Sequence, residues 1–343
     1  MGRVLITGAT GFIGSHVTRI FCEAGIETGC LVRETSNLSN IKNLPVELRY
    51  GEIEDLKSLV NAFKNFDFII HIAAYVHDWG KYETFYKVNV EGTLNVLQAC
   101  YENQVGNIII TGSNSVYGET DCSRVKDENS PGDSHYLYWG DKIFPSRLNY
   151  YRDTKTTAKK KAIEYAKANK LNLTILEPVW VYGEREFHTI FFSYLKVAKS
   201  ALPYLPGCRK NKFHVIYAED LARAYLLAFQ KKLPGIECII IGNEKAESMD
   251  KICSLLCREA GIKKPRNLPK YLSYPIGFIW ELLYTVFNIK TPPMLTRGRV
   301  NMFYDNIEYS TVKAKKLLGF TNSYTLEEGI RKTVAWYKDR KLI

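Results

Sequence analysis

The sequence predicts an α/β protein with a doubly wound parallel sheet and a smaller, mostly helical domain toward its C-terminus. Three observations lead to this fold class. Short, continuously apolar runs alternate with longer segments of helical apolar spacing, a glycine-rich turn follows the first run, and the alternation weakens beyond Pro178. Apolar runs without polar alternation are typical of strands that helices cover on both faces, as in a parallel sheet.

The first unit begins with a strand at Arg3–Thr7, turns at glycines and continues as a helix at Phe12–Ala24. The same periodicities predict further strands at Thr28–Arg33, Val46–Gly51, Phe68–Ala73, Asn107–Thr111 and Leu171–Leu176. They predict further helices at Leu56–Lys64, Phe85–Asn103 and Asn149–Asn169. Strands and helices in this order form a doubly wound sheet of the Rossmann type.

Beyond Pro178 the pattern still predicts a helix at Glu219–Lys231 and a strand at Glu237–Gly242, which returns to the edge of the sheet. Residues 1–182, together with 214–242, are therefore assigned to the Rossmann domain. Residues 183–213 and 243–343, rich in aromatic side chains, are assigned to a second domain that binds the substrate.

The composition is that of a chain that folds throughout. A chain of 343 residues with 46% hydrophobic and 24% charged residues buries a full core, which excludes a disordered chain or a small disulfide scaffold. The 47 basic residues exceed the 36 acidic ones by 11, and residues 250–343 hold 17 bases against 8 acids. Eight cysteines without a CxxC pair, and a first strand with no leader before it, predict reduced thiols, no metal site and a cytoplasmic protein.

The turn after the first strand has the sequence TGATGFIG over residues 7–14. Gly8 and Gly11 allow backbone N–H groups to approach a pyrophosphate, and Gly14 allows the helix to pack closely on the strand. Because this pattern lies between a strand and a helix, it predicts a dinucleotide site rather than an ordinary turn.

The end of the second strand discriminates between the two nicotinamide dinucleotides. An acidic residue there binds the ribose hydroxyls of NAD, whereas a basic residue pairs with the 2′-phosphate of NADP. Arg33 lies 19 residues after Gly14, and Ser36 adds a hydroxyl. NADP is therefore favoured, and Glu34 keeps NAD as the alternative.

Tyr151 and Lys155 are four residues apart on a predicted helix, so both side chains project from one face about 6 Å apart. A tyrosine with a pKa near 10 is a poor base at neutral pH, and an adjacent ammonium lowers that pKa. The neighbouring Tyr150 is in the wrong register, since its i+4 residue is Thr154. The pair predicts proton transfer by Tyr151.

A third element, TGSNSVYG over residues 111–118, follows the strand at Asn107–Thr111. With these three elements in order, the chain resembles the extended short-chain dehydrogenase/reductase family, the superfamily of NAD-dependent epimerases and dehydratases. Further matches are DFIIHIAA at 67–74, NVEGT at 89–93 and PVWVYG at 178–183. Two departures are Glu52, where the family often has aspartate, and Glu177, where it often has arginine.

The resemblance implies a role for each matching residue. Tyr151 would be the general acid/base, Lys155 would lower its pKa and hold the nicotinamide ribose, and Ser113 would hydrogen-bond the reacting oxygen. The residues expected to bind the cofactor are Gly8, Thr10, Gly11, Phe12, Ile13, Gly14, Arg33, Ser36, Glu52, Ile53, Ala73, Ala74, Tyr151, Lys155, Pro178 and Val181. His71 is expected to shape the cofactor turn, and His188 and His214 are interpreted as structural, with contact between His188 and the substrate as the alternative.

Residues 113–115 indicate which reactions of the family this chain can catalyse. Dehydratases of the family carry Thr-Asp-Glu there, whereas this chain has Ser-Asn-Ser, which supplies neither the extra acid nor the extra base. The segments 77–83, 292–306 and 310–320 are similar to the 3β-hydroxysteroid and sterol dehydrogenase branch. We therefore expect an NADP-dependent oxidoreductase that interconverts a hydroxyl and a ketone on a sterol-like substrate. A nucleotide-sugar 4-epimerase with tightly held NAD is the alternative, and a non-catalytic dinucleotide- or RNA-binding relative is a minor one.

The run 271–289 is almost wholly apolar or aromatic and has basic residues on both sides. Pro275 and Glu281 interrupt it, so its uncharged stretches are shorter than the ~20 residues of a transmembrane helix. Such a helix is buried in the substrate domain, walls a lipophilic pocket or lies peripherally on an anionic membrane. The expected partner is a small-molecule substrate and not nucleic acid, and a homodimer is left open.

Overall fold

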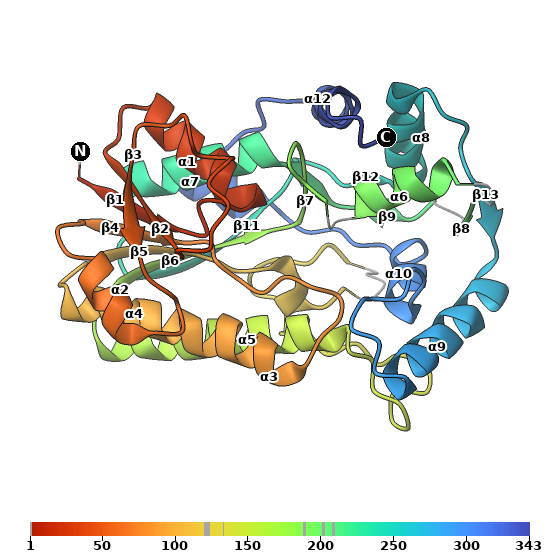
Figure 1. Cartoon of the computed structure of the whole chain (residues 1–343), viewed down its shortest axis with the longest axis horizontal. Coiled ribbons are helices and arrows are strands. Elements are labelled where there is room, and N and C mark those ends of the chain that lie inside the picture. Colours follow the sequence, from red (N-terminus) through yellow and green to blue (C-terminus); the bar gives the residue numbers. More distant parts are fainter. Residues whose placement is uncertain (1, 120–123, 133, 188–189, 201–202, 208–209) are drawn as a thin grey trace.

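A computed structural model describes residues 2–119, 124–132, 134–187, 190–200, 203–207 and 210–343. Within them, seven strands form one sheet in the order β11-β6-β5-β4-β1-β2-β3, and every neighbouring pair is parallel (Figure 1). The strands are β1 Val4–Thr7, β2 Thr28–Val32, β3 Val46–Tyr50, β4 Phe68–His71, β5 Asn107–Thr111, β6 Asn172–Pro178 and β11 Ile236–Ile241. This order confirms the predicted Rossmann fold.

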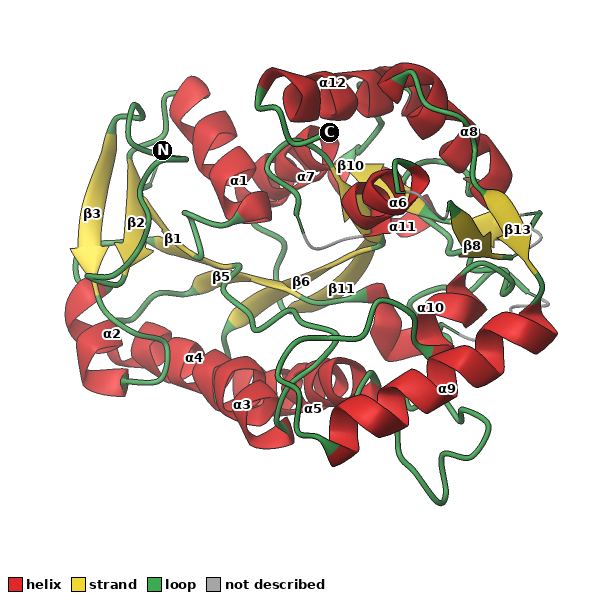
Figure 2. Cartoon of the chain, turned by 45° about the vertical axis from the view of Figure 1, so that its right-hand side comes forward, coloured by secondary structure: helices red, strands yellow, loops and turns green. Residues whose placement is uncertain are grey.

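Helices cover both faces of the sheet, as the apolar strands require (Figure 2). One face carries α1 (Phe12–Glu23) and α7 (Ala218–Lys231), where Phe21, Phe68 and Phe229 meet in the core. The other face carries α2 Leu56–Ala62, α4 Gly92–Glu102 and α5 Asn149–Ala168. The strand expected at Glu237–Gly242 is β11, which lies at the sheet edge beside β6.

The helix expected at Phe85–Asn103 is present, begins earlier, at Tyr82, and contains a π-helical turn. It consists of α3 (Tyr82–Tyr86), a π-helical turn at Lys87–Glu91 and α4. The extra residue of a π turn redirects a side chain. In this turn Asn89 accepts the Tyr75 N–H at 2.8 Å and donates to the Tyr75 carbonyl at 3.2 Å. Asn89 thereby fixes the loop that follows β4.

The remaining elements surround the C-terminal side of the sheet. Short strands pair as β10 with β7, β12 with β9 and β13 with β8. The strands are β7 Trp180–Tyr182, β8 Tyr204–Pro206, β9 Lys212–Phe213, β10 Val215–Tyr217, β12 Glu247–Ser248 and β13 Arg266–Leu268. The helices are a 3₁₀ turn Asn114–Tyr117, α6 Ile190–Ala198, α8 Met249–Ala260, α9 Lys270–Val286, α10 Arg297–Met302, α11 Val312–Leu318 and α12 Leu326–Asp339. The division into two domains stays a prediction.

The apolar run 271–289 forms α9, and its buried side is polar. Ser273, Gly277 and Glu281 are buried, whereas Ile279 and Leu283 are 50% and 45% exposed. Of the placements left open for this run, burial of these large apolar side chains is contradicted, because the Glu281–Arg297 ion pair occupies the buried side of the helix. In the described part of the chain, no helix combines the length and apolarity that crossing a bilayer requires.

Candidate active site

The carboxyl ends of neighbouring strands bring the predicted site residues to one edge of the sheet. In the parallel register Thr7 lies opposite His71, and Thr111 lies opposite Leu176. The residues at or just after these ends are Gly8, Ala73, Ala74, Ser113 and Pro178. Ligands of open parallel sheets bind in the crevice outside these ends. Segments far apart in the sequence therefore meet where a dinucleotide is expected.

The turn after β1 requires glycine at two positions. Gly8 has φ +72°, and a Cβ there would lie 2.7 Å from the Ala73 nitrogen. A Cβ on Gly14 would lie 2.0 Å from the Gly8 carbonyl oxygen. Both distances are far inside van der Waals contact, so Gly14 allows α1 to pack directly against the turn, as predicted.

The start of α1 suits an anionic group. Gly11 is exposed at the N-cap, no side chain caps the helix, and its first turn contains no acidic residue. Thr10, Phe12 and Ile13 are partly exposed in the same turn. The first backbone N–H groups of a helix lack intrahelical partners and attract phosphate. These residues therefore fit the pyrophosphate of a dinucleotide.

The loop after β2 lies next to this turn, because the Asn40 side chain donates to the Thr10 carbonyl at 2.9 Å. The Arg33 N–H donates to Ser36 Oγ at 2.9 Å, and the Ser36 N–H returns a bond to the Arg33 carbonyl. The Arg33 side chain is exposed and forms no ion pair with any residue that the structure describes. Its guanidinium is thus available beside the glycine turn.

Three more residues expected to bind the cofactor are Ile53, Glu52 and Val181. Ile53 packs against Gly92 of α4, where an added Cβ would lie 3.1 Å from its side chain. Glu52 is exposed, and its N–H donates to Ser58 Oγ at 3.0 Å. Val181 is partly exposed in β7. Their contact with a cofactor stays a prediction.

Tyr151 comes from the first turn of α5 and reaches the end of β5. Burial raises the pKa of the Tyr151 hydroxyl to about 12, and a hydrogen bond with Ser113 acts in the opposite direction. The Ser113 hydroxyl is also 2.7 Å from Ser115 Oγ. The structure thus brings Ser113 and Tyr151 together, as the sequence predicts.

Lys155 lies on the same helix, one turn further on. Its Nζ donates to the Thr111 carbonyl at 2.6 Å, and burial lowers its pKa to about 8. The expectation that this ammonium lowers the pKa of Tyr151 is not met here. Burial acts on the tyrosine hydroxyl more strongly, and the ammonium is directed to the backbone of β5.

A buried ion pair that the sequence interpretation missed lies behind Lys155. Glu177 is fully buried, with Oε1 2.8 Å from Lys159 Nζ and Oε2 accepting the Tyr117 hydroxyl at 2.5 Å. Its negative charge also raises the pKa of Lys155 against the effect of burial. The available signal was the spacing, since Lys159 follows Tyr151 and Lys155 at four-residue intervals on α5.

A second missed residue is Tyr225 of α7, whose hydroxyl is 2.6 Å from Thr111 Oγ1. No local motif marks it, because α7 reaches β5 only in the folded chain. His71 is buried with Nδ1 2.8 Å from Thr7 Oγ1, and His214 is buried with Nε2 2.7 Å from the Asn243 carbonyl. These two fit structural roles, and His188 lies outside the described residues.

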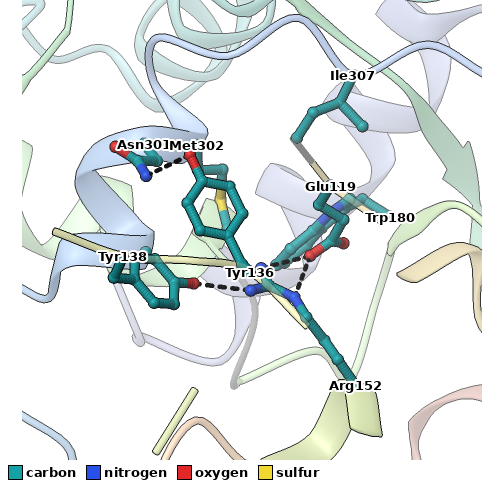
Figure 3. A pocket seen from close by; sticks show the side chains of 9 residues that line it. Glu119, Tyr136, Tyr138, Arg152, Trp180, Asn301, Met302 and Ile307 are labelled. Carbon is teal, nitrogen blue, oxygen red and sulfur yellow. Dashed lines mark hydrogen bonds and ion pairs between the residues drawn. The ribbon is translucent and has the colours of Figure 1, made fainter. Parts of the chain in front are cut away.

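A pocket lies between the start of α5 and α10 (Figure 3). Arg152 binds Glu119 through Nε at 2.8 Å and Nη2 at 2.6 Å, and it donates to the Tyr138 hydroxyl at 2.7 Å. Trp180 Nε1 and Asn301 Oδ1 are buried without a hydrogen-bond partner among the described residues. The full lining is Glu119, Tyr136, Tyr138, Arg152, Trp180, Gly298, Asn301, Met302 and Ile307.

Residues 4–242 match the model of the NAD dependent epimerase/dehydratase family. The chain belongs to this family. The match covers the sheet, the glycine turn and the helix that carries Tyr151 and Lys155. The residues that converge at the sheet edge are thus those of an NAD-dependent enzyme family whose members include oxidoreductases and epimerases.

Curated relatives extend over nearly the whole chain. A 2-alkyl-3-oxoalkanoate reductase of Stenotrophomonas maltophilia is 25% identical over 340 residues, covering 97% of this chain and 98% of its own. The sterol-4-alpha-carboxylate 3-dehydrogenase, decarboxylating, of Mus musculus is 25% identical over 340 residues, covering 97% and 90%. The N-acetyl-alpha-D-glucosaminyl-diphospho-ditrans,octacis-undecaprenol 4-epimerase of Escherichia coli O157:H7 is 26% identical over 341 residues, covering 97% and 95%.

Among solved structures, the UDP-glucose 4-epimerase of Thermotoga maritima superimposes with a TM-score of 0.77 at 21% identity. The superposition covers 99% of each chain. At this identity the likeness shows the shared fold and no common substrate. The expected relation to dehydrogenases of sterols and to sugar epimerases is confirmed at the level of the superfamily.

Proposed function

We propose that this enzyme transfers hydride between NADP and a lipophilic substrate, interconverting a hydroxyl and a ketone. The observation that carries the proposal is the meeting of Ser113 and Tyr151 at the carboxyl end of β5, with Lys155 one turn behind. These groups lie at the sheet edge where the glycine turn also lies. They supply the proton donor and hydrogen bonds that a carbonyl reduction needs.

The bound nicotinamide would supply or accept the hydride. In the reductive direction Tyr151 donates its proton to the carbonyl oxygen, which becomes the hydroxyl. Ser113 hydrogen-bonds the same oxygen and orients it. A tyrosine with a pKa of about 12 is protonated at neutral pH, which suits it to give a proton. Lys155 holds the end of β5 and, with its protonated amine, attracts the ribose hydroxyls.

The choice of NADP rests on Arg33. The guanidinium is exposed beside the glycine turn and pairs with no acid of the described chain, so a 2′-phosphate can take that place. Ser36 lies within the same turn. NAD stays the alternative through the adjacent Glu34.

The lipophilic substrate class rests on the relatives of this chain. The names of the relatives specify an alkyl oxoalkanoate, a sterol carboxylate and an undecaprenol-linked sugar, which share a large apolar portion. The pocket beside α10 would contribute polar anchors rather than an apolar wall, because it combines aromatic rings with the Arg152–Glu119 ion pair and with the unpartnered Trp180 N–H and Asn301 oxygen.

The alternative is 4-epimerisation of a sugar diphosphate with NAD held between turnovers. The E. coli relative, which carries that activity in its name, favours it. It uses the same Ser113, Tyr151 and Lys155, because the same carbon is oxidised and then reduced. The absence of the acid and base of a dehydratase from residues 113–115 is compatible with both reactions.

The test is a substrate panel with the purified enzyme. Consumption of external NADPH with lipophilic ketones supports the proposed reductase. Tightly retained NAD with no net turnover, together with conversion of a sugar epimer, would replace it by the epimerase.

The catalytic assignment has its own matched pair of variants. Tyr151→Phe is expected to reduce turnover below about a tenth of wild type with cofactor affinity changed only a few-fold. Tyr150→Phe removes only a hydroxyl and keeps the ring packed on Tyr82 and Phe85, so its turnover should stay near wild type. Equal turnover of the two variants would refute the role of Tyr151.

A further inference from the structure

One corner of the molecule concentrates its exposed apolar side chains. Of the 20 large hydrophobic side chains that the described residues expose, 12 fall in the segments 137–143 and 271–294. Six of them lie in α9, where Leu272, Ile276, Ile279, Leu283 and Val286 recur at helical spacing on the outward face. Figures 1 and 2 both show α9 at the outer edge of the molecule. Exposed apolar side chains that cluster on one face, rather than lying scattered singly, mark an interaction or membrane surface.

The loop 137–143 lies beside α9 and extends the patch (Figures 1 and 2). The Trp139 ring contacts Phe278 of α9 at 5.3 Å between centroids, and the Trp139 N–H donates to the Tyr274 hydroxyl at 3.2 Å. Ile143 is 92% exposed at the loop tip. We call this surface the apolar platform, composed of Leu137, Trp139, Ile143, Leu272, Ile276, Ile279, Leu283, Val286 and Phe287.

The platform is held rigidly. Arg297 donates to the Trp139 carbonyl at 2.9 Å and to the Phe144 carbonyl at 3.2 Å, while its Nη2 binds Glu281 of α9 at 2.7 Å. Ser146, at the end of the loop, donates to the same Glu281 carboxylate at 2.9 Å. Loop and helix therefore present one preformed surface.

The exposed charges in the segments that form the platform are all positive. Within 137–145 and 270–294 the acids are Asp141 and Glu281, and both are buried. The exposed charges of these segments are Lys142, Lys270 and Lys290, of which Lys270 also lies 3.9 Å from the Asp305 carboxylate. An apolar surface with a cationic fringe matches the acyl boundary and the anionic headgroups of a bilayer. Two copies packed through this face would bring like charges together without an acid between them, which disfavours a dimer.

The platform and the pocket share one segment. Along residues 136–139, Tyr136 and Tyr138 line the pocket, whereas Leu137 and Trp139 are exposed on the platform. At the other end of α9, the Trp79 N–H donates to the Ile289 carbonyl at 2.9 Å, which ties the platform to the loop after β4. A bilayer that covers the platform would thus lie directly behind the candidate substrate pocket.

We propose that the apolar platform docks the protein on the surface of an anionic lipid bilayer, with the lysines at the headgroups and the side chains of α9 and the loop at the acyl boundary. The proposal concerns where the enzyme works and does not depend on which reaction it catalyses. It assigns the exposed apolar face of α9 to lipid rather than to a second copy of the chain.

The experiment is co-sedimentation of the full-length protein with vesicles of phosphatidylglycerol or of phosphatidylcholine, at low and high salt. Wild type should bind phosphatidylglycerol vesicles, and salt should weaken the binding. Ile279→Gln with Leu283→Gln should reduce binding at least about tenfold at an unchanged melting temperature, because both positions are half exposed. Val125→Gln with Val312→Gln, two exposed positions outside the platform, should bind as wild type.

Three outcomes would overturn the proposal. One is no binding of wild type to phosphatidylglycerol vesicles at low salt. The second is equal binding of the platform variant and wild type. The third is a wild-type dimer in light scattering that the platform variant converts to a monomer, which would assign the platform to a second copy.

Discussion

Replacing Glu281 by glutamine tests why α9 faces outward with its apolar side. The Glu281 carboxylate accepts the Arg297 backbone N–H at 2.6 Å, Nε at 3.0 Å and Nη2 at 2.7 Å. The two side chains are 1% and 0% exposed. Removing one charge of such a pair leaves the other buried without compensation, which costs roughly 3–5 kcal/mol of unfolding free energy.

The assay is urea unfolding followed by tryptophan fluorescence, with a surface pair as control. Glu247 binds Lys251 at 2.7 Å, but the two side chains are 35% and 41% exposed. Glu247→Gln should therefore cost less than about 1 kcal/mol. A Glu281→Gln loss as small as that of the control would refute the claim that this ion pair fixes α9, and with it the reason given for the orientation of the helix.

Three further outcomes are expected. Arg33→Asp should weaken NADP relative to NAD by on the order of 10- to 100-fold, since a charge-assisted hydrogen bond is worth roughly 1.5–3 kcal/mol; an unchanged ratio in direct titration contradicts the assignment. Gly14→Ala should abolish cofactor binding, because the new Cβ would lie 2.0 Å from the Gly8 carbonyl oxygen, and retained affinity in calorimetry would count against this geometry. Hydrogen bonds and charge from Asp153 and Asp141 raise the pKa of His135 above 6.5 against its desolvation. That stabilisation is fully present below pH 6.5 and is lost as the pH rises through the folded-state pKa, so His135→Gln should remove this pH dependence from melting curves.

The sheet could be predicted because each strand corresponds to a short apolar run in the sequence. Residues 107–111 contain three consecutive isoleucines between Asn107 and Thr111, and they form β5 with the predicted bounds. The meeting of Ser113 with Tyr151 was expected from the resemblance to the family, and the first turn of α5 brings Tyr151 to the residues that follow β5. Local sequence patterns were therefore sufficient to predict the strands and the motifs that follow them.

Features that depend on partners distant in the sequence were not predictable in this way. The spacing of Tyr151 and Lys155 puts both on one helix face, yet it does not reveal that the ammonium binds the Thr111 carbonyl or that burial dominates the pKa of Tyr151. Tyr225 reaches Thr111 from a helix more than a hundred residues later. Pairings of this kind are set by how helices pack on the sheet, which periodicity leaves undetermined.

The orientation of α9 is the clearest case, and it has a single physical cause. Averaged over 271–289, the sequence is apolar, which is typical of a helix that packs in the core. A carboxylate cannot be buried alone, however, and Glu281 finds its partner in Arg297, sixteen residues later and packed beneath the helix. Ile279 and Leu283 lie two residues before and after Glu281 on the helix. Because Glu281 faces inward, these two side chains face outward on the opposite side of α9. The exposed apolar platform is therefore a consequence of one buried charge, and a change that removes both members of the pair should free α9 to turn its apolar face inward.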